Sequence, residues 1–347
     1  MTKKVVSHPT LADVARIAGV GKATVSRVLN GGERVSPETL ARINDVIRVL
    51  GYQPSQAARS LKGNGTKAVG LVMPSIADPF FASSAEAAQR IAHSRGYLLM
   101  ISSSNYEDQM ELDHLHSLIR HRVEGILLAP GETKNDKRNA LIERLGIPLV
   151  AFNHPVQSRG ITSVVSDNRT GARKATEHLA GHGYRKILCL GGESGLYSIR
   201  ERQRGYMDAM KSAGLTPMLE GEANAPEEVA AVLERYLRRR SIDAIFAVRN
   251  RITILAFQAL QQQGIAIPDR VALLGFDDFD LAPVLRPAIT VVAQPIDEMA
   301  SEAANLLFEQ LHKRSNVKRQ SIKELKTKLI VRGSCGCGTG RGGGREI

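Results

Sequence analysis

The most chemically suggestive segment near the start of the sequence is a run of nine residues, 22–30, with the sequence KATVSRVLN. Read as a helix, this run separates an apolar side from a polar side that holds Lys22, Ala23 and Arg27. In the major groove of DNA, Lys and Arg pair with guanine O6 and N7, and a small Ala can touch a thymine methyl group. The polar side of this helix is therefore predicted to contact base edges.

Hydroxyl and amide side chains in this run and at the start of the helix before it can bond the DNA backbone, which fixes register without reading bases. The alternative is an ordinary solvated helix face. The charge distribution argues against it, because the first 62 residues hold ten Lys and Arg against four Asp and Glu, a net +6 out of +12 for the whole chain. The expected phosphate contacts are Thr10, Thr24, Ser26 and Asn30.

Three short helices must position this run. Apolar residues at helical spacing follow a Thr10 cap over 10–18, and a Gly-Val-Gly turn then separates this helix from the one over 22–30. A third helix is expected from Ser36, with proline at its first position, to Gly51. Two helices joined by a tight glycine turn form a helix-turn-helix.

Four specific motifs lie in this segment: Leu11-Ala12-Asp13-Val14-Ala15, Thr24-Val25-Ser26-Arg27-Val28-Leu29-Asn30, Val35-Ser36 and Leu50-Gly51-Tyr52-Gln53-Pro54. Together with Val20 they closely resemble the headpiece of the lactose/galactose-repressor family, and the resemblance extends to about Gly333. It implies a sequence-specific transcriptional repressor in which Lys22, Ala23 and Arg27 read bases. It also implies a homodimer, or a dimer of dimers, on a pseudo-palindromic DNA operator.

The next segment, Ala57-Ala58-Arg59-Ser60-Leu61-Lys62, resembles the hinge helix of the same family. By that resemblance Ser60, Leu61 and Lys62 contact the minor groove, and Leu61 acts as a wedge between base pairs. The alternative is a linker helix that packs Leu61 against the body of the protein.

From Ala68 onward, short apolar runs alternate with longer amphipathic stretches, which is typical of βα repeats around a parallel sheet. Related Gly-Ile-Pro and Gly-Ile-Ala-Ile-Pro segments in the two halves indicate two similar lobes. The expected fold is an all-α helix-turn-helix headpiece plus an α/β bilobal body of two doubly wound parallel-sheet lobes, as in periplasmic binding proteins. The strands are expected at 68–73, 98–102, 125–129, 149–152, 186–190, 244–247 and 271–274.

These patterns predict four parts of the chain. Residues 1–53 form the headpiece, and residues 54–66 form the hinge helix and linker. The effector-binding and dimerisation body spans 67–333, and residues 334–347 are expected to form a flexible tail. Within the body, the N-lobe is expected at about 67–166 and 296–322, and the C-lobe at about 167–295 and 323–333.

Polar side chains follow several predicted strands, at the edge where open α/β sheets bind ligands. After the first strand, Asp78 precedes Phe80 and Phe81; an exposed ring can stack on a sugar face while the carboxylate bonds a hydroxyl, and one of the two rings is expected in the core. For His154 a surface or capping role is the alternative. The remaining positions that resemble effector contacts of the family are Asn153, His154, Arg202, Arg249, Asp277 and Gln294.

Two departures from the family bear on the effector. Where sugar-binding relatives have Asp-Arg after the fourth strand, this chain has Asn153-His154, and where they commonly have Asn-Asp it has Arg249-Asn250. Arg202 and Arg249 could instead clamp a carboxylate or phosphate. The hypothesis is an anionic effector, a sugar acid or sugar phosphate; the alternative is that Arg249 pairs with Asp277 or Asp278.

Other functions find little support in the sequence. Gly191-Gly192-Glu193-Ser194-Gly195 lacks the glycine order of a nucleotide-binding loop, so no cofactor is expected. Cys335 and Cys337 offer two thiols in the predicted tail, and with no metal-ligand spacing seen among the histidines, no metal is expected. With no secretory signal and no membrane-spanning run, we expect a cytoplasmic protein without membrane contact. The rival interpretations are a solute-binding-protein-like sensor and an α/β enzyme fused to a DNA-binding module.

Overall fold

The computed structural model describes residues 9–29, 35–52, 65–131, 135–158, 160–192, 195–313, 321–337 and 345–346. The chain divides into two compact units, Met1–Thr66 and Lys67–Ile347. The hinge residues Ser60, Leu61 and Lys62, and the predicted phosphate contact Asn30, lie outside the described residues.

The first unit contains three helices, α1 (Leu11–Ile17), α2 (Lys22–Leu29) and α3 (Pro37–Leu50). Local chemistry sets their ends. Thr10 and Asp13 cap α1 reciprocally, Ser36 caps α3 with Pro37 in its first turn, and Gly51 ends α3 in the left-handed conformation. The helices enclose a small core of Val14, Ala15, Ala18, Val25, Val28, Ile43 and Tyr52.

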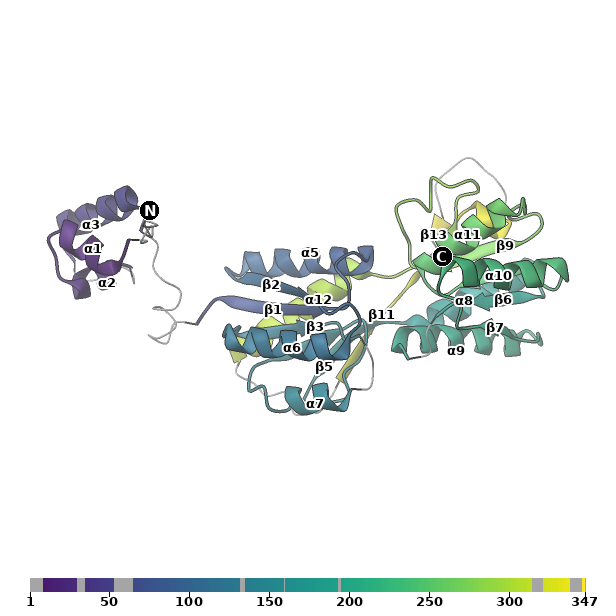
Figure 1. The fold of residues 1–347 in the computed structure, drawn as a ribbon, viewed down its shortest axis with the longest axis horizontal. Coiled ribbons are helices and arrows are strands. Elements are labelled where there is room, and N and C mark those ends of the chain that lie inside the picture. Colours follow the sequence, from purple (N-terminus) through teal and green to yellow (C-terminus); the bar gives the residue numbers. More distant parts are fainter. Residues whose placement is uncertain are drawn as a thin grey trace, which may run out of the picture. The chain divides into compact units, whose positions relative to one another are not determined.

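The second unit holds two α/β lobes, each built on a sheet (Figure 1). The N-lobe sheet is wholly parallel, in the order β11-β5-β4-β3-β1-β2. In chain order its elements are β1 (Ala68–Met73), α5 (Pro79–Ser94), β2 (Leu98–Ser103), α6 (Asp108–Arg120), β3 (Gly125–Leu128), α7 (Asp136–Ile142), β4 (Leu149–Phe152), β5 (Thr162–Ser166), α12 (Ile296–Lys313) and β11 (Ser321–Leu325).

The C-lobe sheet has the order β13-β12-β10-β9-β8-β6-β7, and β12 is antiparallel to both of its neighbours. Figure 1 shows its helices flanking this sheet. Its elements are α8 (Asn168–Gly181), β6 (Ile187–Leu190), α9 (Tyr197–Ser212), β7 (Met218–Glu220), α10 (Pro226–Arg238), β8 (Ala244–Ala247), α11 (Asn250–Gln262), β9 (Ala272–Phe276), β10 (Thr290–Ala293), β12 (Lys328–Val331), the 3-10 turn η1 (Gly333–Cys335) and β13 (Arg345–Glu346).

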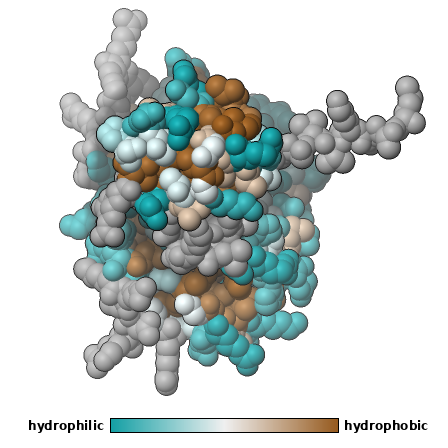
Figure 2. Space-filling model, turned by 90° about the vertical axis from the view of Figure 1, so that its left-hand side faces the viewer, coloured by the Kyte–Doolittle hydropathy of each residue, from teal (hydrophilic) through white to brown (hydrophobic). Residues whose placement is uncertain are grey.

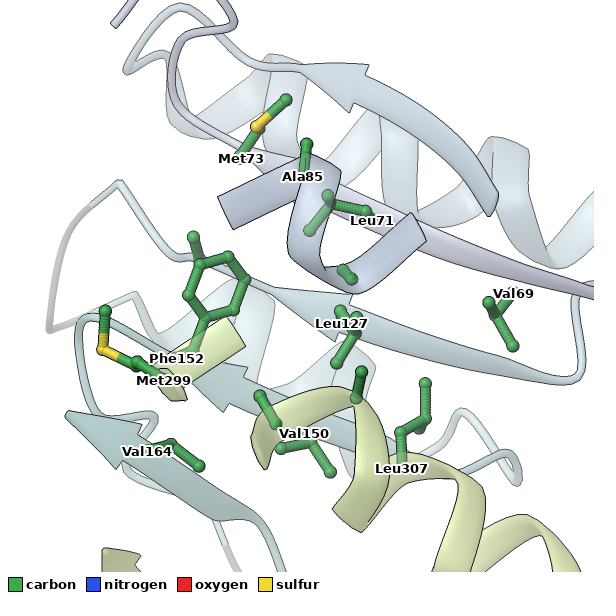
Figure 3. Close-up of a cluster of buried hydrophobic side chains, with 14 of the residues drawn as sticks. Val69, Leu71, Met73, Ala85, Leu127, Val150, Phe152, Val164, Met299 and Leu307 are labelled. Atoms are coloured by element: carbon green, nitrogen blue, oxygen red, sulfur yellow. The ribbon is translucent and has the colours of Figure 1, made fainter. Parts of the chain in front are cut away.

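Helices cover both faces of each sheet. Successive side chains of a strand are therefore buried on opposite faces, each against a different set of helices. In β1, Leu71 packs under α5 and α12, whereas Val72 packs under α6 and α7. Figure 3 shows the first of these clusters, where Met299 and Leu307 of α12 meet Val150 and neighbouring strand residues. The late helix α12 therefore completes the core of a lobe whose strands come mainly from the first half of the chain.

The chain passes between the lobes three times, after β5, after β10 and after β11. The predicted fold class is confirmed, but two boundaries were wrong. All five residues of β11, through Leu325, pair with β5 in the N-lobe, so the last crossing falls after Leu325 rather than at 322–323. The predicted flexible tail is also wrong for residues 334–337, because Ser334 and Cys335 are fully buried against the C-lobe.

One glycine fixes how closely two C-lobe helices pack. A Cβ placed on Gly205 of α9 would lie 2.1 Å from the carbonyl oxygen of Arg169 in α8. A side chain at this position is therefore incompatible with the observed separation of α8 and α9, and that separation matters because both helices carry residues of the cleft described below.

Candidate functional site

The exposed side of α2 carries the predicted base-reading residues. Lys22, Ala23 and Arg27 are exposed, while Val25 and Val28 are buried against α1 and α3. Ala23 and Arg27 are four residues apart and so share one face of the helix. Among the described residues neither Lys22 nor Arg27 has an ion-pair partner, so both cations face outward, which is what a major-groove contact requires.

Two of the predicted phosphate contacts, Thr24 and Ser26, are partly exposed on α2. Thr10 is engaged within its own helix: its hydroxyl donates to Asp13 Oδ2 at 2.6 Å and accepts from the Asp13 amide at 3.3 Å. This cap also lowers the pKa of Asp13 to about 2 through hydrogen bonds from the Thr10 side chain and backbone. Thr10 therefore caps the start of α1, in addition to the contact with the DNA backbone that is predicted for it.

A pocket of about 410 Å³ opens between the lobes. Its N-lobe wall comes from the residues after β1 and β2, and its C-lobe wall from the start of α11 and the loop after β9. These are carboxyl ends of parallel strands, where such folds bind ligands. The lining residues are Ser75, Ala77, Asp78, Pro79, Tyr106, Arg249, Asn250, Arg251, Ile254, Leu255 and Phe279.

Asp78 forms the N-cap of α5, with its side chain accepting from the Phe80 amide at 3.0 Å. Burial raises the pKa of Asp78, as does the charge of Asp277, while Arg249 and Arg202 oppose the rise. Phe80 and Phe81 pack edge-to-face at 5.0 Å, and both belong to the N-lobe core. The expectation that one of these rings is exposed for stacking is wrong, because the first turn of α5 directs both rings onto the sheet.

After β4, Asn153 takes a left-handed backbone conformation (φ 66°) and is buried. His154 is also buried, so the predicted surface role does not apply. Its Nδ1 lies 3.0 Å from the Pro130 carbonyl, which can only accept, so Nδ1 carries the proton and Nε2 accepts from the Ser198 hydroxyl at 3.0 Å. Burial lowers the pKa of His154 to about 4. A neutral histidine thus links the N-lobe to α9 of the C-lobe.

Arg202 of α9 is buried and donates three hydrogen bonds. Its Nε donates to Asn168 Oδ1 at 2.8 Å, and its Nη1 donates to the Val248 carbonyl at 2.7 Å and to Asp277 Oδ2 at 3.2 Å. The guanidinium also stacks 3.7 Å above the ring of Phe276. Asp277 accepts a further bond from Gln294 Nε2 at 2.5 Å. Arg202, Asp277 and Gln294 therefore form one network, and none of the three is among the residues that line the pocket.

Arg249 differs from Arg202 in lacking a carboxylate partner among the described residues. Its Nη2 donates to Asn224 Oδ1 at 2.9 Å, and its buried Nε has no hydrogen-bond partner. The alternative pairing with Asp277 or Asp278 is not observed, since Asp277 pairs with Arg202 and Asp278 pairs with Arg332. Arg249 therefore brings to the pocket wall a positive charge that forms no ion pair with a carboxylate of the described residues.

Several site residues were missed from the sequence. Tyr106 and Phe279 line the pocket after β2 and β9, and the signal that could have found them is their place beyond a strand end. Asn168 and Ser198, which hold Arg202 and His154, sit in the first turns of α8 and α9 and carry no local signal. Their roles depend on contacts between distant segments.

The headpiece and the two-lobed body define a class of DNA-binding transcription regulators, and comparison with known proteins agrees. Residues 10–55 match the bacterial regulatory proteins of the lacI family, and residues 176–335 match the periplasmic binding protein-like domain. The ribose operon repressor of Halalkalibacterium halodurans is 33% identical over 324 residues, which cover 93% of this chain and 96% of the relative.

Two solved structures show the same architecture. The transcriptional regulator CelR in complex with cellobiose is 29% identical, with a TM-score of 0.69 and coverage of 94% of this chain and 99% of that chain. The lac repressor dimer bound to operator and the anti-inducer ONPF is 23% identical, with a TM-score of 0.84 and coverage of 95% and 99%. The chain belongs to the lacI family; it is a DNA-binding transcriptional repressor and not an enzyme. In the described part of the chain, no helix is long and apolar enough to cross a membrane.

Proposed function

We propose that the pocket between the lobes binds a small anionic, sugar-like effector, a sugar acid or sugar phosphate, and that this binding controls operator affinity. The observation that carries the proposal is Arg249, whose buried Nε has no hydrogen-bond partner and which forms no ion pair with a carboxylate among the described residues. A buried donor without a partner costs free energy that a ligand acceptor recovers. A carboxylate or phosphate fits this position best, because charge-assisted bonds to guanidinium are the strongest available.

The rest of the pocket suits a hydroxylated molecule. Asp78 can accept from ligand hydroxyls, and Tyr106 and Phe279 offer rings beside it. Arg251 adds a second cation, so the lining holds two arginines against one aspartate. Arg202 contributes less to anion binding than the sequence suggested, because Asp277 already neutralises it.

Calorimetric titration of the purified repressor with neutral sugars, sugar acids and sugar phosphates tests the proposal. We expect acidic members of the panel to bind and Arg249→Gln to weaken them at least tenfold, while Arg185→Gln, an exposed arginine of the C-lobe, leaves affinity unchanged. Tight binding of a neutral sugar alone, as cellobiose is bound by the regulator CelR, would rule out the anionic effector.

We propose further that α2 lies in the major groove, with Lys22, Ala23 and Arg27 at base edges and Thr24 and Ser26 at phosphates. The outward cations of α2 and the buried opposite face support this orientation. Methylation interference at guanines of a selected operator, compared between the natural chain and Arg27→Ala, tests the assignment of that side chain.

The proposed assembly is a homodimer, which matches a two-fold operator. The edge strand β2 exposes Leu98 and Ile101, and the C-lobe exposes Leu281 and Val284 after β9. Figure 2 shows brown hydrophobic patches among hydrophilic residues on the face that it views. An exposed apolar edge strand is a liability unless a partner covers it. Sedimentation of Leu98→Lys should show monomers at concentrations where the natural chain is dimeric.

A further inference from the structure

Four potential metal ligands from two distant parts of the sequence lie close together at the end of α8. His178 and His182 stand one turn apart at the C-terminal end of this helix, and Cys335 and Cys337 follow β12. One ligand atom from each of the four lies within 4.8 Å of all the others. The sequence interpretation counted the two thiols alone and overlooked the i, i+4 spacing of the two histidines.

The distances within this cluster approach those of a tetrahedral site. His178 Nε2 lies 3.3 Å from Cys335 Sγ and 3.6 Å from Cys337 Sγ, and His182 Nε2 lies 2.9 Å from Cys337 Sγ. Zinc–sulfur and zinc–nitrogen bonds of normal length place tetrahedral ligand atoms about 3.3 to 3.8 Å apart. Small movements of half-exposed side chains therefore suffice to enclose an ion.

The backbone is built to bring both thiols to one side. Gly336 between the cysteines has φ 88°, and a Cβ at this residue would lie 2.8 Å from the Tyr184 hydroxyl. Ser334, the residue before Cys335, is held in place by its hydroxyl, which donates to the Leu273 carbonyl and accepts from the Thr290 amide. The 3-10 turn η1 thus holds Cys335 in a fixed, fully buried position.

The surroundings of the thiols favour coordination. The Thr290 hydroxyl lies 3.1 Å from Cys335 Sγ, an outer contact of the kind that orients metal-binding thiolates. The third cysteine, Cys189, is buried within β6 and outside this cluster.

We propose that His178, His182, Cys335 and Cys337 bind one zinc ion, which fastens the segment after β12 to the end of α8. Four protein ligands fill the coordination sphere, so the site is structural rather than catalytic. It is separate from the effector pocket: His178 lies ten residues, about 15 Å along the helix, from Asn168, which bonds Arg202. The proposal does not depend on the identity of the effector.

Metal titration of the full chain tests this site. Protein purified under reducing conditions is stripped with a chelator and titrated with cobalt, which reports thiolate ligands and tetrahedral geometry in its visible spectrum, and then with zinc. We expect one cobalt ion per chain with thiolate charge-transfer bands, and its displacement by zinc. Absence of those bands at saturating cobalt would overturn the proposal.

Variants at the more accessible ligands separate coordination from folding. His182 is exposed and Cys337 half-buried, so His182→Ala and Cys337→Ser should keep the native circular dichroism spectrum. Each is expected to lower zinc affinity at least a hundredfold and to abolish the rise in melting temperature on zinc addition. Cys189→Ala is the matched control and should retain one zinc ion. Full stoichiometry and unchanged affinity in both ligand variants would refute the assignment.

Discussion

The neutral His154 between the lobes makes the stability of the body dependent on pH. In the folded protein burial lowers the pKa of this side chain from 6.5 to about 4. Between these values the unfolded chain binds a proton that the folded chain excludes, so stability is complete above the unfolded pKa and falls as pH falls toward 4. At about pH 5 the loss from this one group comes to about 2 kcal/mol.

The perturbation that isolates this contribution is His154→Gln, which fills similar space and stays neutral. The free energy of unfolding is measured in urea by far-ultraviolet circular dichroism at about pH 7.5 and about pH 5, for the natural chain and the variant. Other titrating groups are common to both proteins and cancel in the comparison. The stability advantage of the natural chain should therefore shrink by about 2 kcal/mol on acidification.

His93→Gln provides the control, since it replaces an exposed histidine of α5 and leaves His154 and its two partners intact. At neutral pH the free energy of unfolding of His93→Gln should exceed that of His154→Gln. This difference should shrink on acidification by the same amount as the difference between the natural chain and His154→Gln. If the natural chain and His154→Gln lose stability in parallel between the two pH values, the reasoning from burial and from the Pro130 and Ser198 bonds is incorrect.

Three further changes have defined outcomes. Arg27→Ala should cost about 1–3 kcal/mol per half-site and relax discrimination at one base pair in a fluorescence anisotropy competition, whereas Arg42→Ala, an exposed arginine of α3, should leave the ratio between operator variants unchanged. Gly205→Ala should lower the melting temperature by several degrees, because its Cβ meets a backbone carbonyl of α8 that cannot move aside. Arg138→Met should destabilise the N-lobe by about 3–5 kcal/mol in urea unfolding, because it removes the ion-pair partner 3.2 Å from the buried Glu111 carboxylate. Adding Glu111→Gln should restore much of the lost stability.

The headpiece was predictable because its signals are local. The caps at Thr10 and Ser36 and the left-handed Gly51 each act within a few residues, and the helices begin and end where those signals place them. The parallel strands were predictable where a run is uniformly apolar, as in 68–73. The strand Thr162–Ser166 was missed because three of its five residues carry hydroxyl groups, although all five are buried.

The candidate site was less predictable because its chemistry depends on partners distant in sequence. Of the residues proposed from the sequence as effector contacts, Asp78 and Arg249 line the pocket. Nothing local distinguishes Arg202, which forms an ion pair with Asp277, from Arg249, which forms no ion pair with a carboxylate of the described residues. The burial of both Phe80 and Phe81 likewise depends on helix α12, more than 200 residues later. Cys335 meets His178 across 157 residues, beyond the reach of any local pattern.

The return of α12 and β11 to the first lobe has a consequence for biosynthesis. As the ribosome works from the N-terminus, the early strands β1 to β5 emerge long before Met299, Leu307 and Phe308, which cover one face of their sheet. The C-lobe is almost fully synthesised in the interval. The half of the body made first is thus finished nearly last, and until residue 325 has left the exit tunnel the nascent chain exposes apolar surface for chaperones to shield.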